Sequence, residues 1–236
     1  QNFTGGTVKD NWLGDFYSVG ALFGQEYANN VFNGSFIISN NTSASFYNNT
    51  FSGEVSNNNF SGEVNNNTFD YVSNNTFSGY VVINTFSGEV NDNTFSSIVY
   101  NNTFGYVSNN TFSGEVYNNT FSGNVSNNTF SGNINNNTFS GYVNSNTFSG
   151  EVNNNTFSGE VYNNTFSGTV SNNTFTYTGN LLYVTIADEL QSKTIDDVTY
   201  PFLFNTLYKK EILQASNGSN YIRYFNGTAD VNTLIP

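Results

Sequence analysis

The chain has 236 residues, of which 36% are hydrophobic and only 9% are charged, and its formal net charge is −12. It contains no His, Cys or Met, and its five basic residues form no positive surface for phosphate. Without His and Cys the chain lacks the most common general base, the usual zinc ligands and any disulfide. This composition argues against nucleic-acid binding and against most enzyme classes, and we expect no metal or cofactor.

The start of the chain favours a secreted protein. It begins at Gln1 without a Met, as expected after removal of a signal peptide or in a trimmed segment. No apolar run is long enough to cross a bilayer, so we expect no membrane span.

Residues 1–40 are predicted to form an N-terminal cap, with a short helical or irregular plug. Glycines at positions 14, 20 and 24 weaken the prediction of a helix. The apolar residues available for the plug are Trp12, Leu13, Phe16, Tyr17, Leu22 and Phe23.

A nine-residue repeat, Phe-Ser-Gly-Glu-Val-x-Asn-Asn-Thr, fills residues 41–176. Phe recurs at a step of nine from Phe51 to Phe175, and the step shortens to eight only after Phe69 and Phe104. A fixed short period with one aromatic and one β-branched residue per unit predicts a solenoid. The repeat begins in degenerate form near residue 37, with Phe46 in the Val position.

The spacing within the unit predicts its conformation. Phe, Gly and Val stand at offsets zero, two and four, so a single strand would turn all three inward. The remaining x-Asn-Asn-Thr is predicted to form a corner, because Asn tolerates the left-handed backbone of a tight turn. We also expect the corner Asn side chains to form ordered columns.

The outward charges predict two units per coil. In a parallel stack each residue lies above its counterpart, and like charges there are unfavourable. Three units per coil would stack Glu63, Glu89 and Glu115, whereas two units leave no Glu above another Glu and place both eight-residue units on one face. The two predicted outward columns are Glu54, Tyr71, Glu89, Tyr106, Asn124, Tyr142 and Glu160, and Glu63, Tyr80, Ile98, Glu115, Asn133, Glu151 and Thr169.

Residues 177–236 are predicted to form a small C-terminal β region that caps this solenoid or docks onto another subunit. Strands are expected at 181–187, 198–204, 207–213 and 221–225, and the region holds four of the five basic residues. The predicted fold is therefore an all-β parallel solenoid of about seven coils between two terminal regions.

The Phe-Ser-Gly-x-Val-x-Asn-Asn-Thr unit resembles the parallel β-solenoid repeats of microbial and viral fibres, adhesins and tail spikes. The period is also similar to that of the calcium-binding nonapeptide solenoids of secreted toxins. Their Gly-Gly-x-Gly-x-Asp run is missing here, so the resemblance does not imply calcium. The repeat also resembles those of carbohydrate-cleaving β-helices, but the activity of those proteins depends on clustered acids or on cations in a groove.

Many Asn residues stand in Asn-x-Ser/Thr acceptor sequences, which predicts an N-glycosylated surface. The alternative is that Asn-Asn-Thr is simply a good corner and that the acceptors are a by-product. The acceptors are Asn2, Asn33, Asn40, Asn41, Asn48, Asn59, Asn66, Asn74, Asn101, Asn109, Asn118, Asn124, Asn127, Asn136, Asn154, Asn163, Asn172, Asn217 and Asn226.

Three further surface features have competing interpretations. Outward Tyr71, Tyr106 and Tyr142 form a row that could bind surface carbohydrate, or they reflect ordinary β-propensity. The repeated Glu could include a hydrolytic pair, but solvated charge fits their spacing better. A row of outward Ser could form an ice-binding array, although glycans would obstruct it.

These features predict a non-enzymatic protein outside the cell, on a cell or virion surface. The favoured hypothesis is a structural subunit of an N-glycosylated filament or fibre, which binds copies of itself through its terminal regions. The alternative is an adhesive or receptor-binding fibre, cellular or viral, in which the solenoid is a spacer.

Overall fold

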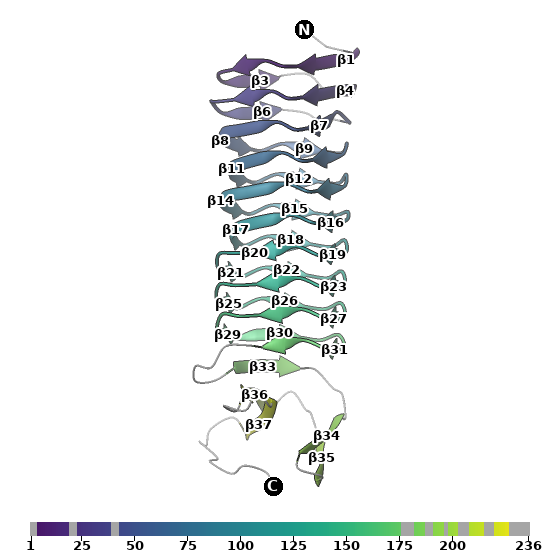
Figure 1. Ribbon diagram of the computed structural model, residues 1–236, viewed down its shortest axis with the longest axis vertical. Helices are drawn as coiled ribbons and strands as arrows, with labels where there is room; N and C mark the ends of the chain where they lie inside the picture. Colours follow the sequence, from purple (N-terminus) through teal and green to yellow (C-terminus); the bar gives the residue numbers. More distant parts are fainter. Residues whose placement is uncertain are drawn as a thin grey trace.

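The computed structural model describes residues 4–18, 23–38, 43–175, 182–186, 191–195, 198–202, 208–214 and 220–226. All the regular secondary structure in these segments is β. The strands stack in parallel into a rod, with β1 (Thr4–Lys9) at one end and the C-terminal strands at the other (Figure 1). The predicted parallel β-solenoid is confirmed.

Three sheets, here called A, B and C, run along the rod. Sheet A contains β1, β4 (Phe23–Ala28), β7 (Ser45–Tyr47), β10 (Val64–Asn65), β13 (Val81–Val82), β16 (Val99–Tyr100), β19 (Val116–Tyr117), β23 (Ile134–Asn135), β27 (Val152–Asn153) and β31 (Val170–Ser171). Sheet B contains β2 (Trp12–Leu13), β3 (Phe16–Ser18), β5 (Val31–Phe32), β6 (Phe36–Ile38), β8 (Thr50–Ser56), β11 (Thr68–Ser73), β14 (Thr85–Asn91), β17 (Thr103–Ser108), β20 (Thr120–Phe121), β21 (Val125–Ser126), β24 (Thr138–Phe139), β25 (Val143–Asn144), β28 (Thr156–Phe157), β29 (Val161–Tyr162) and β32 (Thr174–Phe175). Sheet C contains β9 (Asn59–Phe60), β12 (Thr76–Phe77), β15 (Thr94–Phe95), β18 (Thr111–Phe112), β22 (Thr129–Phe130), β26 (Thr147–Phe148), β30 (Asn164–Phe166), β33 (Leu182–Ile186), β36 (Tyr208–Gln214) and β37 (Asn220–Asn226).

Each coil contains two repeat units, as predicted. Phe121 pairs with Phe139 one coil later, a separation of two nine-residue units. One unit lies in sheet B, and the next passes from sheet C into sheet A. Both eight-residue units, in β11 and β17, lie in sheet B, so their predicted placement on one face is confirmed.

The prediction of one continuous strand from Phe to Val is wrong for most units. A bend at Ser-Gly separates a Thr-Phe strand from a Val-x strand, and in sheet B only β8, β11, β14 and β17 run unbroken from Phe to Val. The two eight-residue units, in β11 and β17, lack one residue at this point, and their pairing with the nine-residue units in β8 and β14 shows a register shift there.

Residues 4–18 and 23–38 form strands, so the predicted helical or irregular plug is wrong for them. Their strands β1 to β6 continue the sheets in parallel, with Val8 opposite Tyr27 and Tyr27 opposite Phe46. Phe46 takes the Val position opposite Val64, as predicted for the degenerate repeat. The nine-residue period is lost here, but the alternation of inward apolar residues that a strand requires is kept.

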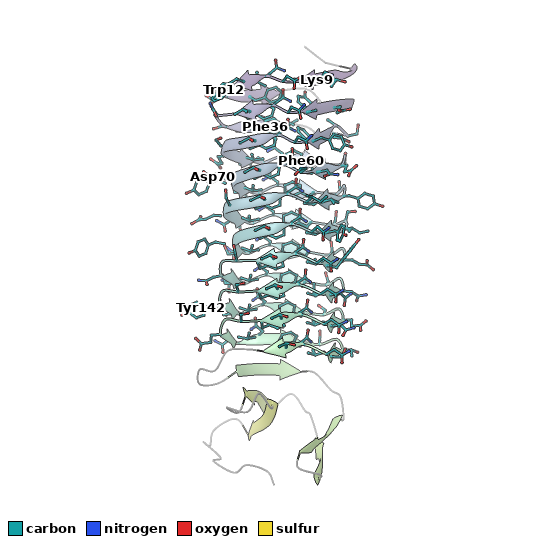
Figure 2. The ribbon with its side chains drawn as sticks, in the orientation of Figure 1. Lys9, Trp12, Phe36, Phe60, Asp70 and Tyr142 are labelled. Atoms are coloured by element: carbon teal, nitrogen blue, oxygen red, sulfur yellow. The ribbon has the colours of Figure 1, made fainter. Side chains whose placement is uncertain are left out.

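Stacked Phe rings form the core. One column of rings rises through sheet B and another through sheet C, and both are at most 1% exposed from Phe51 to Phe166. Neighbouring rings within a column are nearly parallel and stacked, for example Phe121 and Phe139 at 4.7 Å between centroids. Rings of different columns contact each other edge to face, for example Phe112 and Phe121 at 6.5 Å between centroids. Both arrangements are favourable for aromatic pairs, and Figure 2 shows Phe36 and Phe60 inside the rod.

Two ladders of buried Asn side chains hold the corners. Asn119 donates from its backbone N and its Nδ2 to Oδ1 of Asn137, at 2.8 and 3.1 Å. Its Nδ2 also bonds the carbonyl of Val99 one coil earlier, and its own Oδ1 accepts two bonds from Asn102. Each coil repeats these bonds, so the predicted Asn columns are confirmed. Only a carboxamide supplies both the donors and the acceptor that this position uses.

The repeat Gly is required by contact between coils. A Cβ on Gly132 would lie 2.0 Å from the carbonyl oxygen of Gly114, one coil earlier. Gly150 meets Gly132 in the same way at 2.2 Å. Backbone packing between coils therefore explains the Gly of the repeat, a reason that the sequence pattern did not predict.

The C-terminal strands end the parallel stack. The predicted strands correspond to β33, β35 (Val198–Phe202), β36 and β37, and β34 (Gln191–Ile195) was not predicted. β33 pairs in parallel with β30, whereas β36 and β37 add in antiparallel order. β34 and β35 form a separate antiparallel pair. The boundaries of the three predicted regions, 1–40, 41–176 and 177–236, remain predictions.

Replacing Asn119 by Asp should lower the free energy of unfolding by about 3–5 kcal/mol, because it removes the Nδ2 donor and buries a charge. Equilibrium urea denaturation would measure the loss. Asn118→Asp is the matched control, since Asn118 is exposed and Asp occupies the equivalent corner at Asp92. The control should change stability by less than about 0.5 kcal/mol. Equal losses in the two variants would contradict the ladder argument.

Gly132→Ala should destabilise the solenoid by about 1–3 kcal/mol, because the added methyl would collide with the backbone of Gly114. Thermal unfolding followed by circular dichroism would report it. Gly14→Ala serves as the control, since a Cβ at Gly14 would meet no atom within 4 Å. If both changes are neutral, the coils are not packed as closely as described.

Candidate functional site

The corners of the rod present a line of exposed Asn side chains. The first Asn of each Asn-Asn-Thr has a left-handed backbone with φ between 54° and 58°, as predicted, and points to solvent. The second is the buried ladder Asn. The exposed acceptors between sheets A and B are Asn48, Asn66, Asn101, Asn118, Asn136, Asn154 and Asn172, and those between sheets B and C are Asn74, Asn109, Asn127 and Asn163.

The remaining acceptor residues are less uniform. Asn33 is exposed, whereas Asn59 and Asn124 are half-buried. Asn59 occupies the Thr position, and its Oδ1 has no hydrogen-bond partner. Asn226 ends β37, and four predicted acceptors lie outside the described residues: Asn2, Asn40, Asn41 and Asn217.

The predicted outward columns are confirmed. In sheet B, Tyr71 pairs with Glu54, and Glu89 pairs with Tyr106, so no Glu lies above another Glu. Tyr71, Tyr106 and Tyr142 are 50–58% exposed, and neighbours in this row lie two coils apart. Figure 2 shows Tyr142 projecting from the rod. The row is discontinuous, because Glu89 and Asn124 separate its members.

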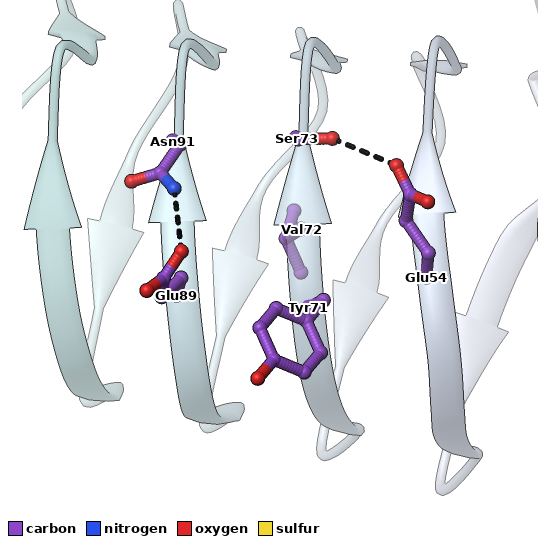
Figure 3. A pocket seen from close by; sticks show the side chains of 6 residues that line it. All are labelled: Glu54, Tyr71, Val72, Ser73, Glu89 and Asn91. Carbon is purple, nitrogen blue, oxygen red and sulfur yellow. Dashed lines mark hydrogen bonds between the residues drawn. The ribbon is translucent and has the colours of Figure 1, made fainter.

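An open pocket of about 320 Å³ lies on sheet B around Tyr71 (Figure 3). Val72 forms its floor, and Glu54 and Glu89 lie on the strands to either side. Glu54 accepts a hydrogen bond from Ser73 at 3.2 Å, and Glu89 accepts one from Asn91 at 3.1 Å. Both carboxylates are exposed and engaged by neutral side chains, an arrangement that suits solvated charge.

The Ser hydroxyls after Phe point outward, but several bond to the preceding coil. Ser122 Oγ donates to the carbonyl of Phe104 at 2.9 Å, and Ser87 Oγ donates to that of Phe69 at 3.1 Å. These hydroxyl donors support the stack and are not presented freely to an ordered array of water.

Two Tyr residues, the buried Tyr27 and the half-buried Tyr47, have perturbed acidity. Burial raises the pKa of Tyr27 to about 12, and burial is also the main reason why the pKa of Tyr47 is raised. The Tyr47 hydroxyl donates to Glu63 at 3.1 Å, which favours its protonated form. Among the described residues, no group of three or more acidic side chains could hold a metal ion. In the same part of the chain, no helix is long and apolar enough to cross a membrane.

Comparisons with known proteins give no further guidance: no protein-family model, no curated protein and no solved structure matches this chain.

The outer face of sheet A, where Tyr80 and Ile83 are about half exposed, carries no predicted site. The outward column predicted for Tyr80 and Ile98 explains only how these residues separate the charges of Glu63 and Glu115. The sequence feature that indicates this face is Ile83, which takes the place of the corner Asn.

The buried Tyr27 predicts a loss of stability in alkali. Its hydroxyl ionises near pH 10 in the unfolded chain but only near pH 12 in the folded one, so the folded state is favoured below pH 10 and loses this advantage as the pH rises through 12. Thermal melts between pH 8 and 12 should show the decline. Tyr27→Phe should flatten it, whereas Tyr142→Phe, at an exposed site, should not.

Proposed function

We propose that this protein is a structural subunit of an N-glycosylated extracellular filament or surface fibre that assembles through its terminal regions. The observation that carries the proposal is the geometry of the corners. Eleven acceptor Asn side chains point away from a continuous ladder, at positions whose backbone needs no repacking to carry a glycan. A rod whose glycan acceptors lie outside its packed core suits a structural component of a surface.

The two ends of the rod differ, which favours head-to-tail assembly. At one end β1 and β2 are the last strands of sheets A and B in the described part, and Trp12 of β2 is 75% exposed. At the other end sheets A and B stop at β31 and β32, while sheet C continues into β36 and β37. Unpaired strand edges accept strands from other chains. Contacts between unlike surfaces build open filaments when the rotation does not close a ring.

A second candidate is an adhesive or receptor-binding fibre, cellular or viral, with the solenoid as its spacer. The exposed Tyr71, Tyr106 and Tyr142 favour it, because aromatic rings on a rigid strand suit binding to surface carbohydrate. Both candidates are non-enzymatic and place the protein on a cell or virion surface.

Cryo-electron microscopy of native material would test assembly. Helical filaments with one subunit repeating along the axis are the expected result, with protruding density at the A-to-B corners. Isolated monomers or discrete trimers with ligand affinity would favour the adhesive fibre instead.

Glycopeptide mass spectrometry of the same material would test modification. Peptides containing Asn66 and Asn118 should carry sugar. Asn57 is an internal control, since it has the same exposed left-handed corner but Asn59 stands where Thr is needed. Bare polypeptide at every acceptor would remove the glycoprotein proposal and leave the corner sequence as a purely structural motif.

A further inference from the structure

Three adjacent coils depart from the repeat at the same place on the outer face of sheet A. The first coil presents Tyr80 and Val82, the second Ile98 and Tyr100, and the third Tyr117. In-register pairing places Val82 above Tyr100 and Tyr100 above Tyr117, and the Val81 N–H bonds the Ile98 carbonyl. With Ile83 at the adjoining corner, these six residues form what we call the sheet A patch.

Ile83 is held in a conformation that suits it poorly. Its φ is 58°, in the left-handed region, and its side chain is 49% exposed. Every other non-Gly residue with positive φ in the described chain is Asn, Asp or Ser. A β-branched residue there is a true outlier. Backbone strain at a half-exposed residue is typical of a functional surface.

The same substitution opens a gap in the line of glycan acceptors. Asn at position 83 would form Asn-Asn-Thr with Asn84 and Thr85. Between Asn48 and Asn172 every other corner from sheet A to sheet B carries an acceptor. The one corner without an acceptor therefore adjoins the apolar part of the face.

The chemistry of the patch fits a neutral, hydroxyl-rich ligand. Tyr100 and Tyr117 stack at 4.4 Å, and Tyr80 is 54% exposed. Hydrogen-bonding groups flank these aromatic residues along the rod. At one end the Glu63 carboxylate accepts from Asn65 Nδ2 at 2.9 Å. The other end has carboxylate and amide side chains in the same columns, namely Glu115, Asn133 and Asn135.

Charge and size exclude other ligands. No Lys or Arg occurs between Lys9 and Lys193, so nothing near the patch could balance a phosphate, sulfate or carboxylate. With strands about 4.8 Å apart and residues about 3.3 Å apart, the three strands and four residue positions of the patch span roughly 10 Å in each direction. A stable protein interface needs about 800 Å² on each partner. A narrow ligand therefore fits better than a second subunit.

We propose that the sheet A patch binds a neutral oligosaccharide, with the exposed Tyr80 side chain packing against the sugar. The hydroxyls of the stacked Tyr100 and Tyr117 would bond to its hydroxyl groups, and the flanking carboxylate and amide groups would accept its hydroxyl hydrogens. The proposal does not depend on filament formation. A protein that assembles but binds no sugar would disprove this proposal alone, and one that binds sugar as a monomer would leave it intact.

Isothermal titration of the full chain with maltohexaose, cellohexaose and mannohexaose tests the site. At least one should bind, and the double change Tyr100→Ala and Tyr117→Ala should weaken that binding roughly tenfold or more. Trp12→Ala, at an exposed aromatic residue of β2 that lies in neither the sheet A patch nor the Tyr row of sheet B, is the control and should bind as the unchanged protein does. No binding to any probe, or equal weakening by the control, would overturn the proposal.

Ile83→Asp separates binding from folding. Asp occupies the equivalent corner at Asp92, and this change creates no acceptor. It should raise the melting temperature by roughly 2–4 °C while weakening sugar binding. A lower melting temperature with unchanged binding would show that Ile83 is a packing residue. A change of sedimentation coefficient in the double Tyr variant would show that the patch contacts a second copy. Either result would contradict the proposal.

Discussion

In-register parallel stacking is the constraint on which this structure depends. Each residue lies about 4.8 Å from its counterpart in the next coil, so every side chain must be compatible with a copy of itself. Asn meets this requirement because one carboxamide both donates and accepts, and Phe meets it because offset rings attract. Gly meets it by letting backbones touch. Glu does not, and it alternates with Tyr or Asn along its columns.

The same constraint acts differently on buried and on outward positions of the repeat. Phe, Val and the ladder Asn are fixed by their neighbours above and below, so they carry little information that differs between coils. The outward positions accept many residue types, provided that like charges do not lie above one another, and they vary between coils. Differences between coils therefore identify the surfaces where a partner can be recognised. The corners from sheet A to sheet B repeat the same glycan acceptor from coil to coil. The corner at Ile83, beside the sheet A patch, lacks this acceptor.

Much of the fold could be predicted from particular residues. The period of Phe51 to Phe175 gave the solenoid, and the spacing of Glu63, Glu89 and Glu115 gave two units per coil. The left-handed corners and the buried Asn columns also followed from residue chemistry. Residues 4–18 and 23–38 were mispredicted because their strands lack the nine-residue period. The exposed Tyr row was found, but the patch around Ile83 was not, because its members are spread over 38 residues and only stacking brings them together.

The sequence by itself determined the repeat, the two-unit coil and the chemistry of the corners, because these follow from local parity and from the self-compatibility of one unit. Tertiary structure alone decided where the strands bend, why Gly is needed and which outer residues are neighbours. Those features depend on contacts between residues about 18 positions apart, whose distance is fixed by the ladder and not by the chain between them.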